Sequence, residues 1–112
     1  MFTKNSSPDS LQQEADLLKA MGHPIRLCIL HGLRDGFSAN VSHLQKCLMV
    51  PQSTLSQHLG ILRHAGIIAG DRKGTEIQYR IIDQRVNQLL SLLILRSKTN
   101  QSSSEENGSL IL

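Results

Sequence analysis

Apolar side chains recur at a helical period through most of the chain, and polar clusters separate these segments. Leu11, Ala15 and Leu18 share one face of a first predicted helix. Its start would be a capping box over residues 10–13, and its end lies near Gly22. The pattern therefore predicts an N-terminal helix with one apolar face.

Three more helices follow from the same period. The second begins at Pro24, which suits a first helical turn, and closes at residues 35–36. The third begins after Asn40, a residue type that favours the N-cap. A turn at residues 50–51 separates it from a fourth helix over residues 52–65, because the residue before a proline is pushed out of the helical region.

After Gly66 the period changes from the helical one to alternation. Ile77, Tyr79 and Ile81 alternate with polar residues, and the sequence DRKG at 71–74 is polar and contains glycine. These features predict a two-stranded hairpin with its turn near the end of that tetrapeptide.

A last helix is predicted over residues 83–97. One of its faces carries four apolar side chains, namely Val86, Leu89, Leu90 and Leu93. Leu92, Ile94 and Leu95 widen this face beyond what one small domain needs. The extra apolar surface indicates a partner for this helix.

The order of elements predicts a mainly α protein with a small β-hairpin. Two short helices joined by a tight turn and followed by a basic hairpin make a winged helix-turn-helix, with the order α-α-α-α-β-β-α. We expect this domain to cover residues 10–98, between a flexible arm at 1–9 and a polar, disordered tail at 99–112.

Composition narrows the class of protein. A chain of 112 residues with 39% hydrophobic residues and no tryptophan predicts one domain with a core mostly of leucine and isoleucine. The apolar runs are too short to span a bilayer, and no signal peptide opens the chain. Two cysteines are too few for a disulfide scaffold. We therefore expect a soluble, cytoplasmic protein.

The net charge of +3 is concentrated in one segment. Residues 40–80 carry five basic and two acidic residues, whereas basic and acidic residues balance in the rest of the chain. Since a clustered positive charge favours nucleic acid more than a dispersed one does, this segment is the candidate contact surface.

The fourth helix has an uncharged polar face. Leu55, Leu59 and Leu62 lie on one side, while the opposite side carries small hydrogen-bonding residues and Gly60. A helix in the major groove needs such a surface, although a solvated polar face gives the same pattern. The predicted DNA contacts, including basic residues of the hairpin, are Gln52, Ser53, Thr54, Ser56, Gln57, His58, Arg63, Arg72, Lys73 and Arg80.

Three stretches resemble the ArsR/SmtB family of transcriptional repressors: LLKAMGHPIRLCILHGL, VPQSTLSQHLGILRHAGII and RKGTEIQYRI. The resemblance covers roughly residues 11–95. It implies a homodimer held by the first and last helices and two recognition helices that read an imperfect palindrome in double-stranded promoter DNA. The corresponding dimerisation residues are Leu11, Leu18, Val86, Leu89, Leu90 and Leu93.

The metal-binding positions of this family carry other residues here. Asn40 and Ser42 stand where one family site has cysteines, and no histidine follows His64 to supply the other. We therefore expect no metal cofactor. His43 and Cys47 have a spacing that can chelate, but Cys47 is in line with the apolar face of its helix and is expected in the core.

Two alternatives to a metal-independent repressor stay open. A redox-responsive repressor would use Cys28 or Cys47, although the family's sulfur-sensing position falls at His31 and the last helix has no cysteine. A winged-helix module that binds protein is the other alternative. An enzyme is not expected, because no cluster pairs a nucleophile with a base.

Overall fold

The structure is a computed structural model that describes residues 7–94. The predicted N-terminal arm over residues 1–9 therefore lies mostly outside the described residues, and Leu95 and the tail over residues 99–112 lie wholly outside them. The predicted helices and hairpin are present. The helices are α1 (Gln12–Met21), α2 (Pro24–Leu33), α3 (Val41–Leu48), α4 (Gln52–His64) and a C-terminal helix described over residues 84–94.

Local sequence explains most of the helix boundaries. The Nδ1 atom of His23 accepts a hydrogen bond from the backbone N–H of Ile25, so a histidine caps α2 just before Pro24. Asn40 caps α3 as predicted, because its Oδ1 accepts from the N–H of His43 at 2.8 Å. Met49 then adopts a left-handed conformation, which ends α3 and begins the tight turn to α4.

The capping box predicted for α1 is wrong. A 3₁₀ turn over Asp9–Leu11 precedes α1, and no side chain caps the helix at Leu11. The Ser10 hydroxyl instead donates to the backbone oxygen of Ser7 at 2.9 Å. A serine can satisfy a nearby backbone group in a turn as well as at a helix start, so the sequence pattern alone did not decide between them.

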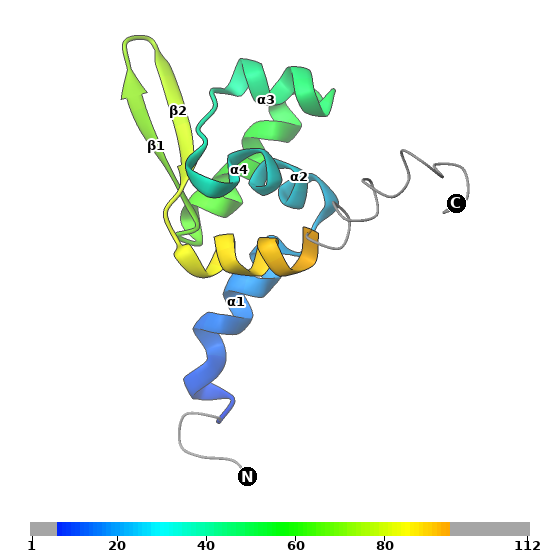
Figure 1. The fold of residues 1–112 in the computed structure, drawn as a ribbon, viewed down its shortest axis with the longest axis vertical. Helices are drawn as coiled ribbons and strands as arrows, with labels where there is room; N and C mark the ends of the chain where they lie inside the picture. The colour runs from blue at the N-terminus through cyan, green and yellow to red at the C-terminus, as the bar shows by residue number, and fades with distance from the viewer. Residues whose placement is uncertain (1–6, 95–112) are drawn as a thin grey trace, which may run out of the picture.

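The hairpin consists of β1 (Ile68–Lys73) and β2 (Glu76–Ile81), paired antiparallel with Ile68 opposite Ile81. Gly74 has a φ of 67°, which suits the tight turn at the tip. Backbone hydrogen bonds between Ala39 and Tyr79 attach the hairpin to the segment before α3. Figure 1 shows the hairpin tip and α3 at the end of the molecule opposite to the one from which α1 extends.

The core joins all the helices to the base of the hairpin. As expected, it is mostly leucine and isoleucine, with Ile29, Leu30 and Leu33 from α2 wholly buried against Leu55 and Leu62 of α4. The leucine side of α4 therefore faces inward, which leaves its polar side toward solvent.

Candidate nucleic-acid interface

The exposed surface of α4 is polar and uncharged in its first two turns. Gln52, Ser53, Ser56 and Gln57 are exposed, while Thr54 is half-buried. Pro51 precedes the helix, no side chain caps it, and its first turn has no acidic residue. The first N–H groups of α4 are therefore available to phosphate oxygens, next to side chains that can pair with base edges.

His58 lies on the same helix but has partners within the chain. Its Nδ1 is 3.1 Å from Nη1 of Arg26, and its ring centroid is 4.4 Å from that of His23. Burial lowers the pKa of His58, and the charges of His23 and Arg26 lower it further. His58 is thus a half-buried side chain held by the start of α2, which its place in the sequence did not indicate.

The cations of the hairpin differ in their surroundings. Arg72 and Lys73 are exposed next to the turn. Arg80 instead donates from Nε to Oδ2 of Asp71 at 2.6 Å, a contact that lowers the pKa of Asp71 and raises that of Arg80. Within residues 7–94, Arg72 and Lys73 form no ion pair, whereas the charge of Arg80 is balanced by Asp71 within the hairpin. Arg63 is exposed in the last turn of α4.

The structure places both thiols on the surface, so the expected burial of Cys47 is wrong. Cys28 and Cys47 are both exposed. The Sγ atom of Cys47 lies 3.8 Å from Nε2 of His43, one helical turn away on α3. Within residues 7–94, no three histidine, cysteine, aspartate or glutamate side chains form a group that would hold a metal ion.

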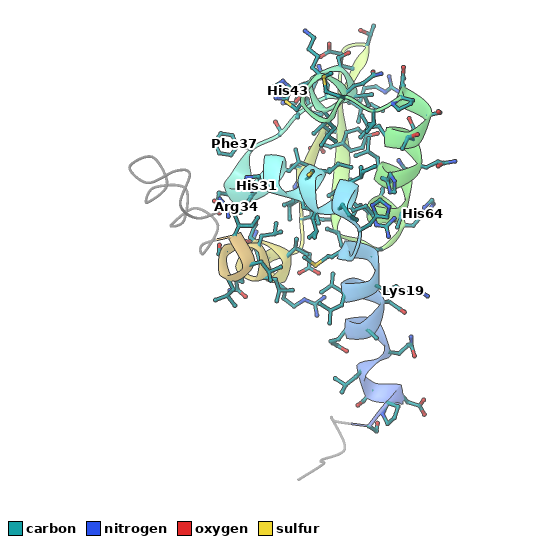
Figure 2. The ribbon with its side chains drawn as sticks, turned by 90° about the vertical axis from the view of Figure 1, so that its right-hand side faces the viewer. Lys19, His31, Arg34, Phe37, His43 and His64 are labelled. Carbon is teal, nitrogen blue, oxygen red and sulfur yellow. The ribbon has the colours of Figure 1, made fainter. Side chains whose placement is uncertain are left out.

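Figure 2 shows His43 on the α3 side of the molecule and His64 at the other end of α4, near α1. His64 Nδ1 lies 2.8 Å from the backbone oxygen of Gly60. A Cβ added at Gly60 would meet nothing within 4 Å, so packing within the chain does not require a glycine there. The predicted close approach of a partner at Gly60 therefore stays a prediction.

An apolar surface lies between α1 and the C-terminal helix. Leu18 is 57% exposed, Leu92 73% and Leu93 61%. With Leu27 and Leu89 these side chains line a hollow of about 320 Å³. An apolar surface of this kind is typical of a protein–protein contact.

Two of the predicted dimerisation residues lie in the core instead of on the surface. Val86 and Leu90 are fully buried in the core of the chain itself, so they have no surface to offer a partner. Leu11, Leu18 and Leu93 are exposed and Leu89 is half-buried. The helical period assigns all apolar residues of the last helix to one face. Only the packing of α1 and α2 against that helix shows which of these residues lie in the core and which lie on the surface.

The helix-turn-helix, its polar second helix and the basic hairpin define a winged helix-turn-helix DNA-binding protein. Residues 21–71 match the family described as a helix-turn-helix domain. The chain is 40% identical to the transcriptional repressor PagR of Bacillus anthracis over 75% of this chain and 84% of PagR.

Solved structures agree with this relationship. The repressor BigR from Xylella fastidiosa has a TM-score of 0.73 at 33% identity, covering 84% of this chain and 95% of that one. HlyU from Vibrio cholerae has a TM-score of 0.72 at 33% identity, covering 83% and 95%. The chain belongs to the ArsR/SmtB family of winged helix-turn-helix transcriptional repressors, and both PagR and BigR are named as transcriptional repressors. No helix within residues 7–94 is long and apolar enough to cross a membrane.

Proposed function

We propose that this repressor is a homodimer that binds an imperfect palindrome in promoter DNA and excludes polymerase from it. The observation that carries the proposal is the pairing of two surfaces on one small domain. One is the uncharged polar face of α4 together with the exposed cations Arg72 and Lys73, and the other is the apolar face of α1 and the C-terminal helix.

In this proposal the two kinds of DNA contact are divided between elements. Ser53, Ser56 and Gln57 of α4 read base edges in the major groove. Arg72 and Lys73 at the hairpin tip bind phosphates or the adjacent minor groove. A dimer with two such domains would read two half-sites about one helical turn apart.

Repression in this proposal does not depend on a metal at the family's known positions. Asn40 uses its side chain to cap α3, and Ser42 offers a hydroxyl where a thiolate would be needed. Loading the protein with Zn²⁺ should therefore leave its affinity for promoter DNA unchanged.

The test is a fluorescence anisotropy titration of the protein with its own promoter region over a range of salt concentrations. We expect specific binding that weakens steeply with salt, because phosphate contacts release counterions. The Ser56→Ala, Gln57→Ala double variant should lose about 1–3 kcal/mol per good base contact and bind promoter and random DNA alike. Gln13→Ala, which truncates an exposed polar side chain of α1, is the control. Equal affinity of the unaltered protein for all sequences would contradict the proposal and favour a protein-binding module.

One observation favours a second candidate, a redox-responsive repressor. Cys47 is exposed on the first helix of the helix-turn-helix and lies beside His43. Oxidation of this thiol would add polar bulk close to the DNA-binding helix. Mild peroxide should then weaken promoter binding in the unaltered protein and in Cys28→Ser, but not in Cys47→Ser. Equal affinity before and after peroxide would exclude this candidate.

A further inference from the structure

Arg26 connects two helices that have different proposed tasks. Its Nε donates to the backbone oxygen of Ala20 in the last turn of α1 at 2.6 Å. Its Nη1 donates to Nδ1 of His58, in the middle of α4, at 3.1 Å. Arg26 itself lies in the first turn of α2, so one guanidinium links three helices that pack together.

The chemistry of the guanidinium makes this link directional. Its donors are fixed in one plane, so two acceptors bound by one arginine are also fixed relative to each other. A lysine has a single ammonium on a flexible stem and cannot impose that geometry. Because Arg26 is half-buried and Ala20 is buried, these hydrogen bonds are partly shielded from water, which strengthens them relative to fully exposed ones.

We propose that Arg26 is a positioning residue for DNA recognition, which sets the direction of α4 relative to α1 by holding His58 and the end of α1 at once. This inference rests on the proposed function, in which α4 reads DNA and α1 belongs to the dimer contact. A shift of α4 against α1 would misplace both recognition helices on their half-sites, since the two domains of a dimer are joined through α1.

The same contact fixes the protonation state of His58. An arginine has no acceptor, so Nδ1 of His58 must accept and its ring proton must be on Nε2. His23 is held in the corresponding way, because its Nδ1 accepts from the N–H of Ile25. The charged or titratable groups in contact with His58 are thus His23 and Arg26, and no carboxylate in residues 7–94 forms an ion pair with any of the three.

Acid should therefore break the link. A proton on Nδ1 removes the acceptor that Arg26 uses and places a second positive charge beside the guanidinium. The pKa of His58 is already lowered by burial and by its two neighbours, which agrees with a neutral His58 at neutral pH. Below that pKa, α4 would lose its tie to α2 and α1.

The first experiment measures affinities of full-length variants for the promoter palindrome and for random DNA. Arg26→Lys keeps the charge and loses the two-acceptor geometry, and we expect the ratio of specific to random affinity to fall by about tenfold. Lys19→Met, which removes an exposed cation from α1, should leave the ratio unchanged. A ratio within twofold of the unaltered protein in Arg26→Lys would overturn the proposal.

A second measurement separates positioning from a direct phosphate contact. In Arg26→Met the salt dependence of binding to random DNA should match that of the unaltered protein, because no phosphate contact has been removed. A drop of about 0.9 in the slope of log affinity against log salt would mean that Arg26 neutralises a phosphate, and would overturn the positioning role.

A pH series on the unaltered protein and on His58→Asn decides the matter if the Arg26 variants do not fold. Asparagine supplies an acceptor near the place of Nδ1 and does not titrate. Between pH 7.5 and 4.5, a range that extends well below the ordinary histidine pKa because the pKa of His58 is lowered, the affinity ratio should fall in the unaltered protein and stay level in His58→Asn, whatever its starting value. A level ratio in the unaltered protein, or an equal fall in both, would overturn the proposal. Failure of the proposed function looks different, since the unaltered protein would then show no preference for the palindrome at any pH.

Discussion

Among the residues of the DNA-facing surface, the main distinction is between side chains that have partners in the chain and side chains that do not. Gln57 and Ser56 are exposed, with no side-chain hydrogen bond to the rest of residues 7–94. His58 and Arg80 were also predicted to contact DNA, yet each is held by another side chain. Their availability to DNA therefore depends on Arg26 and Asp71.

The ion pair in the hairpin leads to a prediction about Asp71. Asp71→Asn removes one negative charge and releases Arg80, so affinity for random DNA should rise and the salt slope should steepen by about 0.9, the value for one added phosphate contact. The measurement is an anisotropy titration at several salt concentrations. Asp16→Asn on α1 removes the same charge far from the hairpin and serves as the control. An unchanged slope in Asp71→Asn would mean that Arg80 does not reach the phosphates.

These residue-level partners were the part of the site that the sequence could not provide. Arg26 and His58 are 32 residues apart and belong to different helices, so no local pattern links them. The polar face of α4 was predictable, because it follows from the leucine period of a single helix. Short-range periodicity predicts which side of a helix faces solvent. Long-range contacts decide which side chains on that side are already held by other parts of the chain.

For whole elements, the predicted helix boundaries agree better with the structure than the predicted contacts of single side chains do, because helix ends depend on nearby residues. Asn40 and Pro24 act within one turn of their own positions, and both behave as predicted. Gly70 is a different case, since the contacts that require a glycine there come from the opposite strand of the hairpin. A Cβ there would be 2.7 Å from Cγ2 of Ile77 and 3.1 Å from Cε1 of Tyr79. The strand therefore needs a glycine where side chains of β2 cross over it.

The C-terminal helix depends on a cap that gives a measurable prediction. Asp83 precedes this helix, and its Oδ1 accepts from the backbone N–H of Arg85 at 2.9 Å. Asp83→Ala should destabilise the protein by about 1 kcal/mol, a typical cost of a lost N-cap, and lower the Tm by about 4–8 °C. Asp83→Asn keeps an acceptor and should lose less. Thermal unfolding followed by circular dichroism measures both, and equal Tm values for all three proteins would contradict the capping role.

The pH dependence of this cap has a definite sign. Hydrogen bonds from the Arg85 side chain, and its charge, hold the pKa of Asp83 below the usual aspartate value. A depressed pKa means that the folded state binds the proton less readily than the unfolded chain. The contribution of Asp83 is therefore complete above about pH 4 and is lost as the pH falls further. In Asp83→Asn this part of the acid sensitivity should be absent.

The assembly of the whole molecule follows from the division of apolar residues between core and surface. Val86 and Leu90 stabilise the single chain, while Leu18, Leu92 and Leu93 form an apolar surface that no other part of residues 7–94 covers. The width of the last helix's apolar face in the sequence indicated a partner, but could not say which residues meet it. That separation needs the position of α1, which only the fold provides.

A dimer contact at this surface can be tested with exposed residues alone. Leu18→Glu with Leu93→Glu should give a folded monomer, because both side chains are more than half exposed and neither supports the core. Phe37→Glu changes an equally exposed apolar residue, 67% exposed, elsewhere on the molecule and is the control. Sedimentation should show a halved mass for the double variant only, and its affinity for the palindrome should drop to that for a single half-site. A double variant that keeps the mass of the unaltered protein would place the dimer contact elsewhere. A monomer that still binds the palindrome with full affinity would show instead that one domain is enough for recognition.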